Sequence, residues 1–490
     1  SHAAFLTFVN PPHSAIALVQ DRSGEPLPDP GFEARFDTFT PSVISTLQPG
    51  DSNTTLESAN SIAYDPITKT VLLANGKRIN GYPHSTGLLL VDVSFPPYPV
   101  QLGTEQITAG LAYDVALVPD VQISPRPCTA CQPSNPPIVD PLTGNLALVV
   151  SGSTEIFSNL RIYHLDPVAN PPYMGAQLLT TPSGGSPLPP IPAASGIPVA
   201  VATSNVCHPA APGDSCVAYV ATTPLGIQAI DIPRAIPRQR TLTNGGREPL
   251  APIRDTFEGN FRAVDFMAGR VLAIGNLSGA GGSGLTMLTP DLASYMELPL
   301  AGANRVTGVE GFSAALDSDG DGSLDAIATF QLALVGADPG VHVMACDNAS
   351  LACPLLGTLS TAVQDNPVSV YEITVDRAAK LAYLSTHGST LLIADLEGLF
   401  DSQGHFVQGT ASCAGQLCLD RDGDHTDDRI LGIINLAEPG AVVRKTALDP
   451  QRGLLYLAND EAGLAIVRVQ PVQAFFNRDR AVLSAGRQFR

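Results

Sequence analysis

Short apolar runs bounded by glycine and proline recur along this chain. One of them, Leu88 to Val93, follows Gly87, contains a single polar residue and ends before a proline-rich segment, after which apolar residues resume at Val100. A run this short suits a strand, and the prolines exclude a helix that continues through them. The segment Asn159 to Leu178 repeats the pattern, with the same Pro-Pro-Tyr triplet in its turn. We therefore expect a repeat fold built from strand, turn and strand.

Two recurring units define the expected repeat. Upstream of several of these strands lies a strand, an aspartate turn and a second strand, at 61–76, 137–152, 371–388 and 444–460. Because aspartate caps tight reversals, the innermost strand is expected to end at Asp65, Asp140, Asp376 or Asp449. The later strand of each repeat opens at a glycine or an asparagine. The seven markers are Gly87, Asn159, Gly226, Gly284, Gly340, Gly388 and Gly463.

These units predict an all-β fold, a seven-bladed β-propeller, although six or eight blades fit the spacing as well. The last blade, ending at 463–470, lacks a clear outer strand, and the N-terminal segment, with apolar stretches at 5–20 and 41–48, can supply it. Such a closure would remove an exposed sheet edge. We expect one propeller across 1–470, with 1–50 as the closure segment and first outer strand, blades from about residue 57 onward, and 471–490 as a separate tail.

The segment GLLLVDVSFPPYP, residues 87–99, resembles the LVIVD repeat of secreted and surface-attached β-propellers. The segment 226–243 is similar to a weaker copy of the same repeat. The resemblance implies a propeller fold in an exported protein. That family is defined by its blades, so the resemblance implies no catalytic residue.

Composition narrows the classes of partner. The formal net charge is −19, with 27 lysine and arginine residues in all, which disfavours nucleic acid and anionic membrane surfaces. A run of about 20 apolar residues, which membrane insertion would need, is missing. The chain has 44 glycines, 43 prolines and no tryptophan, in keeping with many short strands and turns. With this negative charge, we expect any bound ion to be a cation and not an anion.

The eight cysteines form four pairs that are close in sequence. Zinc sites and thioredoxin-type motifs need contexts that these pairs do not have. We expect four local disulfides, and hence a secreted, extracellular, cell-surface or periplasmic protein. The expected pairs are Cys128 with Cys131, Cys207 with Cys216, Cys346 with Cys353, and Cys413 with Cys418.

Two acidic turns have the spacing of calcium loops, with oxygen ligands at positions 1, 3, 5 and 9. The first is similar to the DxDxDGxxD loops of integrin-type propellers, and the second has His425 where that pattern has glycine. We expect one Ca²⁺ in the first loop and a second in the other. The predicted ligands are Asp317, Asp319, Asp321, Ser323 and Asp325, and then Asp420, Asp422, Asp424 and Asp428.

The expected blade order places the calcium loops and disulfides on one face and leaves the opposite face for a protein or glycan partner. Enzyme signatures are mostly missing, since the chain has no GxSxG elbow, P-loop, HExxH or CxxCH motif. The first hypothesis is a secreted or cell-surface binding or structural module, which could belong to a larger surface assembly. The alternative is a lactonase-like or esterase-like hydrolase, or an oxidoreductase, with its site at the central channel. The candidate channel residues are Asp114, Arg262, Asp265, Glu310, Glu372 and Arg444.

Overall fold

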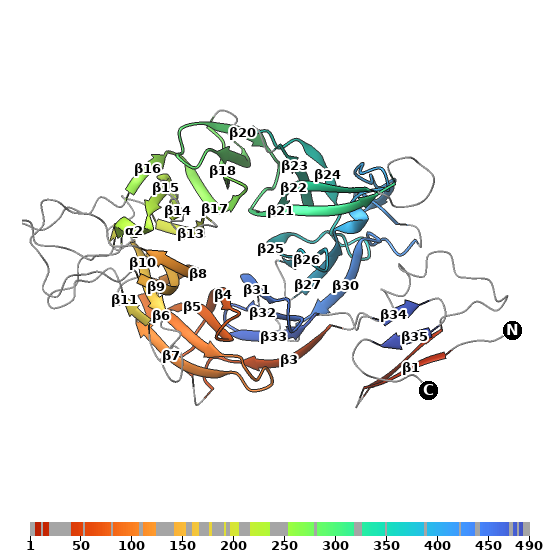
Figure 1. Cartoon of the computed structure of the whole chain (residues 1–490), viewed down its shortest axis with the longest axis horizontal. Helices are drawn as coiled ribbons and strands as arrows, with labels where there is room; N and C mark the ends of the chain where they lie inside the picture. The colour runs from red at the N-terminus through yellow and green to blue at the C-terminus, as the bar shows by residue number, and fades with distance from the viewer. Residues whose placement is uncertain are drawn as a thin grey trace, which may run out of the picture.

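The computed structural model is a ring of seven β-sheets around a central axis (Figure 1). It describes residues 5–10, 13–18, 41–51, 54–79, 82–106, 111–123, 142–152, 159–165, 176–178, 191–192, 197–204, 216–235, 253–278, 282–317, 326–347, 350–386, 390–420, 423–436, 442–469, 474–477 and 480–483. The predicted seven-bladed propeller is confirmed. In this described part no helix is long and apolar enough to cross a membrane.

Each blade is an antiparallel sheet whose first strand lines the axis. Blade 1 consists of β4 (Ala59–Asp65), β5 (Thr70–Ile79), β6 (Tyr82–Asp92) and β7 (Val100–Gln106). Blade 2 consists of β8 (Leu111–Ile123), β9 (Leu142–Gly152), β10 (Asn159–Leu165) and β11 (Ala176–Leu178), and β12 (Ile191–Pro192) also pairs with β10. Blade 3 consists of β13 (Ile197–Thr203), β14 (Val217–Thr223), β15 (Gly226–Asp231) and β16 (Ile253–Phe257), with the short helix α2 (Ile232–Ala235) after β15.

The second half of the ring has the same order. Blade 4 consists of β17 (Asn260–Met267), β18 (Arg270–Asn276), β19 (Ser283–Leu288) and β20 (Tyr295–Pro299). Blade 5 consists of β21 (Arg305–Leu316), β22 (Ala326–Gly336), β23 (Val341–Cys346) and β24 (Leu355–Leu359). Blade 6 consists of β25 (Val370–Asp376), β26 (Leu381–Thr386), β27 (Thr390–Asp395) and β30 (Ile430–Asn435). Between β27 and β30 lie η2 (Glu397–Leu399) and the hairpin β28 (Ala411–Cys413) and β29 (Gln416–Cys418).

The last blade is closed by the N-terminal part of the chain, as predicted. Blade 7 consists of β31 (Lys445–Asp449), β32 (Leu454–Ala458), β33 (Leu464–Arg468) and β3 (Ser42–Leu47). The strand β3 pairs with β33 from Ser42 opposite Arg468 to Leu47 opposite Leu464. Two further hairpins, β1 (Phe5–Asn10) with β2 (His13–Leu18) and β34 (Ala474–Asn477) with β35 (Arg480–Leu483), form separate sheets, and β1, β34 and β35 are seen outside the ring in Figure 1.

The core lies between blades. Seven apolar clusters each combine residues of two neighbouring blades, including one that joins blade 7 to blade 1. Second strands are therefore covered on both faces, and β26 and β32 are buried along their whole length. This explains why these strands read as continuous apolar runs instead of alternating patterns. Each blade is stable because it buries both of its faces against its neighbours.

The predicted inner strands are confirmed in three blades and displaced in one. β4, β25 and β31 end at Asp65, Asp376 and Asp449. In blade 2 the inner strand is β8, which ends at Ile123 and pairs with β9, so the expectation of an inner strand ending at Asp140 is wrong. A long apolar strand precedes that position, and Asp140 lies outside the described residues.

Candidate functional site

Five of the seven inner strands begin with a β-bulge at the same end of the channel. The register shifts by one residue at Asn60, Tyr113, Val199, Arg262 and Tyr371, in blades 1, 2, 3, 4 and 6. In blade 5 the N–H of Asn304 donates to Gly336, the residue that Arg305 opposes. In blade 7 the N–H of Arg444 donates to Ala458, the residue that Lys445 opposes. In blades 5 and 7, the residue just before the inner strand thus bonds to the same neighbour that the first residue of the strand faces, and it takes the place of the bulge residue.

The bulges build the mouth of the channel. A bulge turns consecutive side chains toward the same side of a strand. The five extra residues and their counterparts Asn304 and Arg444 line a cavity of about 440 Å³, together with Leu111 and Arg305. We call these seven residues the mouth ring. They are Asn60, Tyr113, Val199, Arg262, Asn304, Tyr371 and Arg444.

The residue after each member of the mouth ring belongs to a second ring. This second ring lines an adjoining cavity of about 410 Å³ along the axis, together with part of the mouth ring and with residues farther along the inner strands of blades 2 to 7. It consists of Ser61, Asp114, Ala200, Ala263, Arg305, Glu372 and Lys445. The channel therefore carries charged groups from blades 2, 5, 6 and 7 close to its entrance.

Tyr371 lies at the centre of the positive part of the mouth. The guanidinium carbons of Arg305 and Arg444 lie over its ring, at 5.1 and 5.5 Å from the centroid. Arg444 Nη1 donates to the Tyr371 hydroxyl at 3.1 Å, and Arg305 Nε donates to the Tyr371 carbonyl at 3.2 Å. Burial raises the pKa of the phenol, but the two positive charges outweigh burial, so its pKa is lowered.

The three arginines of the mouth differ in their partners. Arg444 donates to Asp460 through Nε at 3.0 Å and Nη2 at 2.5 Å. Arg305 Nε lies 3.5 Å from Glu372 Oε2. Arg262 donates to the carbonyl of Ala303, and no carboxylate lies within ion-pair distance of it in the part of the chain that the structure describes. Partial burial and the charge of Arg305 lower the pKa of Arg262.

The second ring links distant blades through Asp114. Its Oδ1 accepts from Ser61 at 2.5 Å and from Lys445 Nζ at 2.6 Å, and its Oδ2 accepts from the N–H of Val201 at 2.9 Å. Lys445 belongs to blade 7, Ser61 to blade 1 and Val201 to blade 3. One carboxylate on β8 therefore holds four blades together at the axis.

Two carboxyl groups of the channel have raised pKa values. Burial raises the pKa of Glu372 to about 7, although Arg305 and Lys445 oppose the change. Burial also raises the pKa of Asp265 to about 6, while the N–H groups of Gly308 and Phe266, which donate to it at 2.7 and 2.8 Å, lower it. Both groups titrate in the range where an acid or a base is useful near neutral pH.

Of the six channel residues expected from the sequence, five line these cavities. Arg262 and Arg444 lie at the mouth, and Asp114, Asp265 and Glu372 lie deeper. Glu310 does not line either cavity, because a separate register shift between Val309 and Phe312 turns it toward the turn after β17, where Ala268 donates to its carboxylate.

Sequence reasoning missed Tyr371, Arg305 and Lys445. Tyr371 and Lys445 each lie next to an expected residue, Glu372 or Arg444. A strict alternation of side chains would have turned one of each pair away from the channel. Aligning the seven segments in which the inner strands begin would have revealed these residues. In that alignment the mouth ring occupies one column and the second ring occupies the next.

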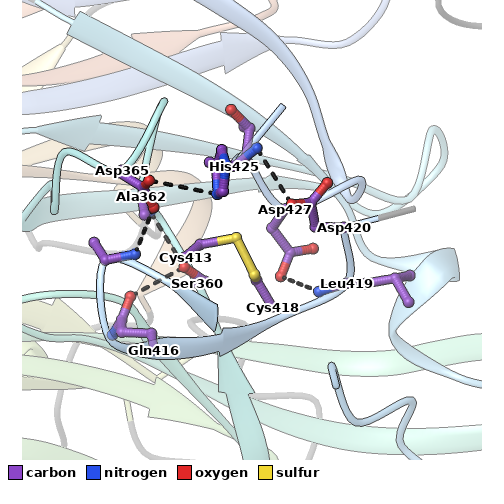
Figure 2. Close-up of a disulfide and its surroundings, with 12 residues drawn as sticks. Ser360, Ala362, Asp365, Cys413, Gln416, Cys418, Leu419, Asp420, His425 and Asp427 are labelled. Carbon is purple, nitrogen blue, oxygen red and sulfur yellow. Dashed lines mark hydrogen bonds and ion pairs between the residues drawn. A yellow bond between two sulfur atoms is a disulfide. The ribbon is translucent and has the colours of Figure 1, made fainter. Parts of the chain in front are cut away.

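The disulfide Cys413–Cys418 closes the β28–β29 hairpin, which contacts the neighbouring blade (Figure 2). Gln416 Oε1 accepts from Ser360 Oγ at 3.1 Å, and its Nε2 donates to the carbonyl of Pro339 at 2.9 Å. Ser360 begins the connection from β24 to β25, and Pro339 lies in the turn between β22 and β23. Both connections lie on the mouth face, because strands alternate in direction.

The acidic loop 420–428 contacts the same connection. His425 Nδ1 lies 3.4 Å from Asp365 Oδ2, a pair drawn in Figure 2. This loop was expected on the face opposite the partner surface, together with Cys413 and Cys418. The hairpin departs from that expectation, since its Gln416 reaches connections of the mouth face, whereas the acidic loop leads directly into β30 at Ile430. Asp317 follows the far end of β21 and remains on the opposite face.

Neither acidic loop is described in full. Asp319, Asp321, Ser323, Asp325 and Asp422 lie outside the described residues. Within the described ones no group of three or more acidic, histidine or cysteine side chains is placed to hold a metal. Asp420 Oδ1 accepts from the N–H of Gly423 at 2.7 Å, and Asp424 Oδ1 accepts from the N–H of Thr426 at 2.7 Å. Asp428 donates its N–H to the carbonyl of Leu419 at 2.6 Å.

Two of the expected disulfides are confirmed. They are Cys346–Cys353 and Cys413–Cys418. Cys216 is disulfide-bonded, while Cys207, Cys128 and Cys131 lie outside the described residues. Disulfides of this kind fit an oxidising compartment.

Comparison with known proteins adds no function. No family model and no curated protein matches the chain. Among solved structures, the chain is similar to hydrazine synthase from Kuenenia stuttgartiensis, with 12% sequence identity and a TM-score of 0.48, over 87% of this chain and 100% of that chain. A likeness at this level carries no argument about activity.

Proposed function

We propose that this protein is a secreted or cell-surface propeller that binds a protein or glycan partner at the mouth of its central channel. The observation that carries the proposal is the mouth ring. Bulges leave a ladder position unpaired, so five of them at one end of the channel, with Asn304 and Arg444 at the matching positions of the other two blades, are not needed to close a propeller. Their effect is to turn seven side chains into one cavity. Sites on a rigid scaffold with a concave, mixed lining are where ligands usually bind.

The mouth ring is presented by rigid elements. Each of its members is followed directly by a residue that is paired in an inner strand, and the second ring beneath it is cross-linked by Asp114, Lys445 and Ser61. The cavity of about 440 Å³ falls within the usual size range of ligand pockets. Binding at such a site loses little conformational entropy, which favours affinity.

Calcium belongs to the proposal as a stiffener of the scaffold. The support is the spacing of carboxylates in both loops and the backbone of the second one. Gly423 and His425 have φ values of +78° and +63°, so position 6 of the loop adopts the left-handed conformation that calcium loops usually give to glycine. A chelator should lower the melting temperature, because an ion bound to the folded form stabilises it. An unchanged melt in EDTA would remove calcium from the proposal.

A blocked mouth tests the binding function. The variant Val199→Tyr adds bulk to the mouth ring, whereas Ile327→Tyr makes a similar change at a position on β22 that is 76% exposed. Arrays of glycans and of extracellular proteins would be probed with both variants and with the parent protein. We expect Val199→Tyr to lose a bound partner that Ile327→Tyr retains. A partner bound equally by all three proteins would place recognition elsewhere.

A hydrolase with its site in the channel is the second candidate. The pKa values of Glu372, at about 7, and of Asp265, at about 6, favour it, because buried carboxyls that titrate near neutral pH often serve as acids or bases. A screen of esters and lactones with the parent and with Glu372→Gln tests this candidate. Turnover that the variant abolishes would support a hydrolase, and absence of turnover would leave the binding function.

A further inference from the structure

The two sides of the mouth differ in chemistry. Consecutive blades 4 to 7 supply Arg262, Arg305, Tyr371 and Arg444, and the facing blades 2 and 3 supply apolar surface. The apolar side consists of Leu111, Tyr113 and Val199. A ligand that fills the cavity therefore meets guanidinium groups on one side and hydrocarbon on the other.

On the positive side, Arg262 is the arginine for which the described part of the chain supplies no carboxylate within ion-pair distance. Arg444 is paired with Asp460, and Arg305 with Glu372. Arg262 has only the Ala303 carbonyl as a partner among the described residues. Arg305 lies beside it, because its Nη1 donates to the Arg262 carbonyl at 3.1 Å. One negative group placed against Arg262 and Arg305 would complete the charge pairing of the mouth, and a planar carboxylate matches the guanidinium fork.

We propose that the mouth binds the C-terminal carboxylate of a partner protein whose last residue is apolar, with the carboxylate on Arg262 and Arg305 and the terminal side chain against Leu111 and Val199. This inference rests on the proposed binding function and specifies its partner. A free amino acid fits less well, because its ammonium group would enter a mouth that already carries the charges of Arg262, Arg305 and Arg444. In a C-terminal residue that nitrogen is an uncharged amide. An acidic sugar would satisfy the arginines but would leave the apolar side without contacts.

The probe is an N-acetylated tetrapeptide that ends in leucine, compared with its C-terminal amide, with free leucine and with glucuronate. Binding to the full chain would be measured by calorimetry or by saturation-transfer NMR. We expect the free acid to bind about tenfold or more tighter than its amide, the effect of one charge-assisted hydrogen bond. Arg262→Gln should remove this difference, and Arg262→Lys should restore part of it.

A matched control is Arg254→Gln on β16, which removes an arginine 3.8 Å from Asp255 and away from the channel. It should leave both affinities unchanged. Equal binding of acid and amide would overturn the proposal. If only glucuronate binds, and Arg262→Gln abolishes that binding, the ligand would be an acidic glycan and not a protein C-terminus. That result would leave the proposed binding function intact. If no probe binds and Val199→Tyr changes no partner binding, both proposals fail.

Discussion

The ion pair between Asp427 and Arg429 is the most sensitive position in the insertion of blade 6. Both side chains are at most 1% exposed, and two bonds of 2.8 and 2.7 Å join them. Arg429 also donates to the carbonyl of Val407 at 3.0 Å, and Asp427 accepts from the N–H of Leu419 at 3.3 Å. The pair fixes the segment that leads into β30. Asp427→Asn would keep the shape of the side chain and remove its charge.

The expected loss follows from burial. Removing one partner of a buried pair leaves the other charge without compensation, which costs about 3–5 kcal/mol. Because Arg429 keeps only the Val407 carbonyl and one amide oxygen, we expect Asp427→Asn to fall in this range. The double variant Asp427→Leu with Arg429→Met should lose less, since no charge is left buried. An exposed pair gives the contrast: Glu461, 67% exposed and 3.0 Å from Lys77, contributes about 0–1 kcal/mol.

Urea unfolding of the parent, Asp427→Asn, the double variant and Glu461→Gln would measure these differences. Every sample would contain EDTA, so that occupancy of the neighbouring acidic loop does not enter the comparison. A change of less than about 1 kcal/mol for Asp427→Asn would refute the reasoning, because the pair would then behave like one at the surface. A double variant less stable than Asp427→Asn would refute it as well.

Three further predictions concern the channel and the blades. The pKa of Glu372 is raised to about 7, so its stabilisation is present below the ordinary value of 4.5 and is lost as pH rises through 7. Glu372→Gln should flatten the pH dependence of the free energy of unfolding, measured in urea between about pH 5 and pH 8, by up to about 3 kcal/mol, and parallel profiles would contradict this. Lys445→Met leaves Asp114 without its cation at the axis and should cost about 2 kcal/mol, and an unchanged thermal midpoint would count against the role of that pair. Gly226→Ala should destabilise far more than Gly269→Ala, because both glycines have positive φ but a Cβ at Gly226 would lie 1.8 Å from a backbone oxygen, while none lies within 4 Å at Gly269; equal losses would disprove the steric argument.

The sequence by itself determined the repeat and its closure. Turn residues and apolar runs act locally, so Gly87, Gly226 and Gly463 marked third strands without knowledge of the ring. Asp65 and Asp449 likewise end inner strands because an aspartate turn depends on its own neighbours. The sequence also showed that blade 7 is one strand short. In a closed propeller only the N-terminal segment can supply that strand.

The tertiary structure alone decided which side chains meet at the axis. Strand alternation turns neighbouring residues to opposite faces, so Tyr371 and Glu372 reach the same channel only because a bulge intervenes. The position of a bulge depends on the register with the adjacent strand, which sequence periodicity does not contain. The insertion that carries Cys413 and Cys418 to blade 5 is equally non-local. The fold follows from short-range patterns, whereas the mouth ring depends on the hydrogen-bond register between strands and on seven blades closing around one axis.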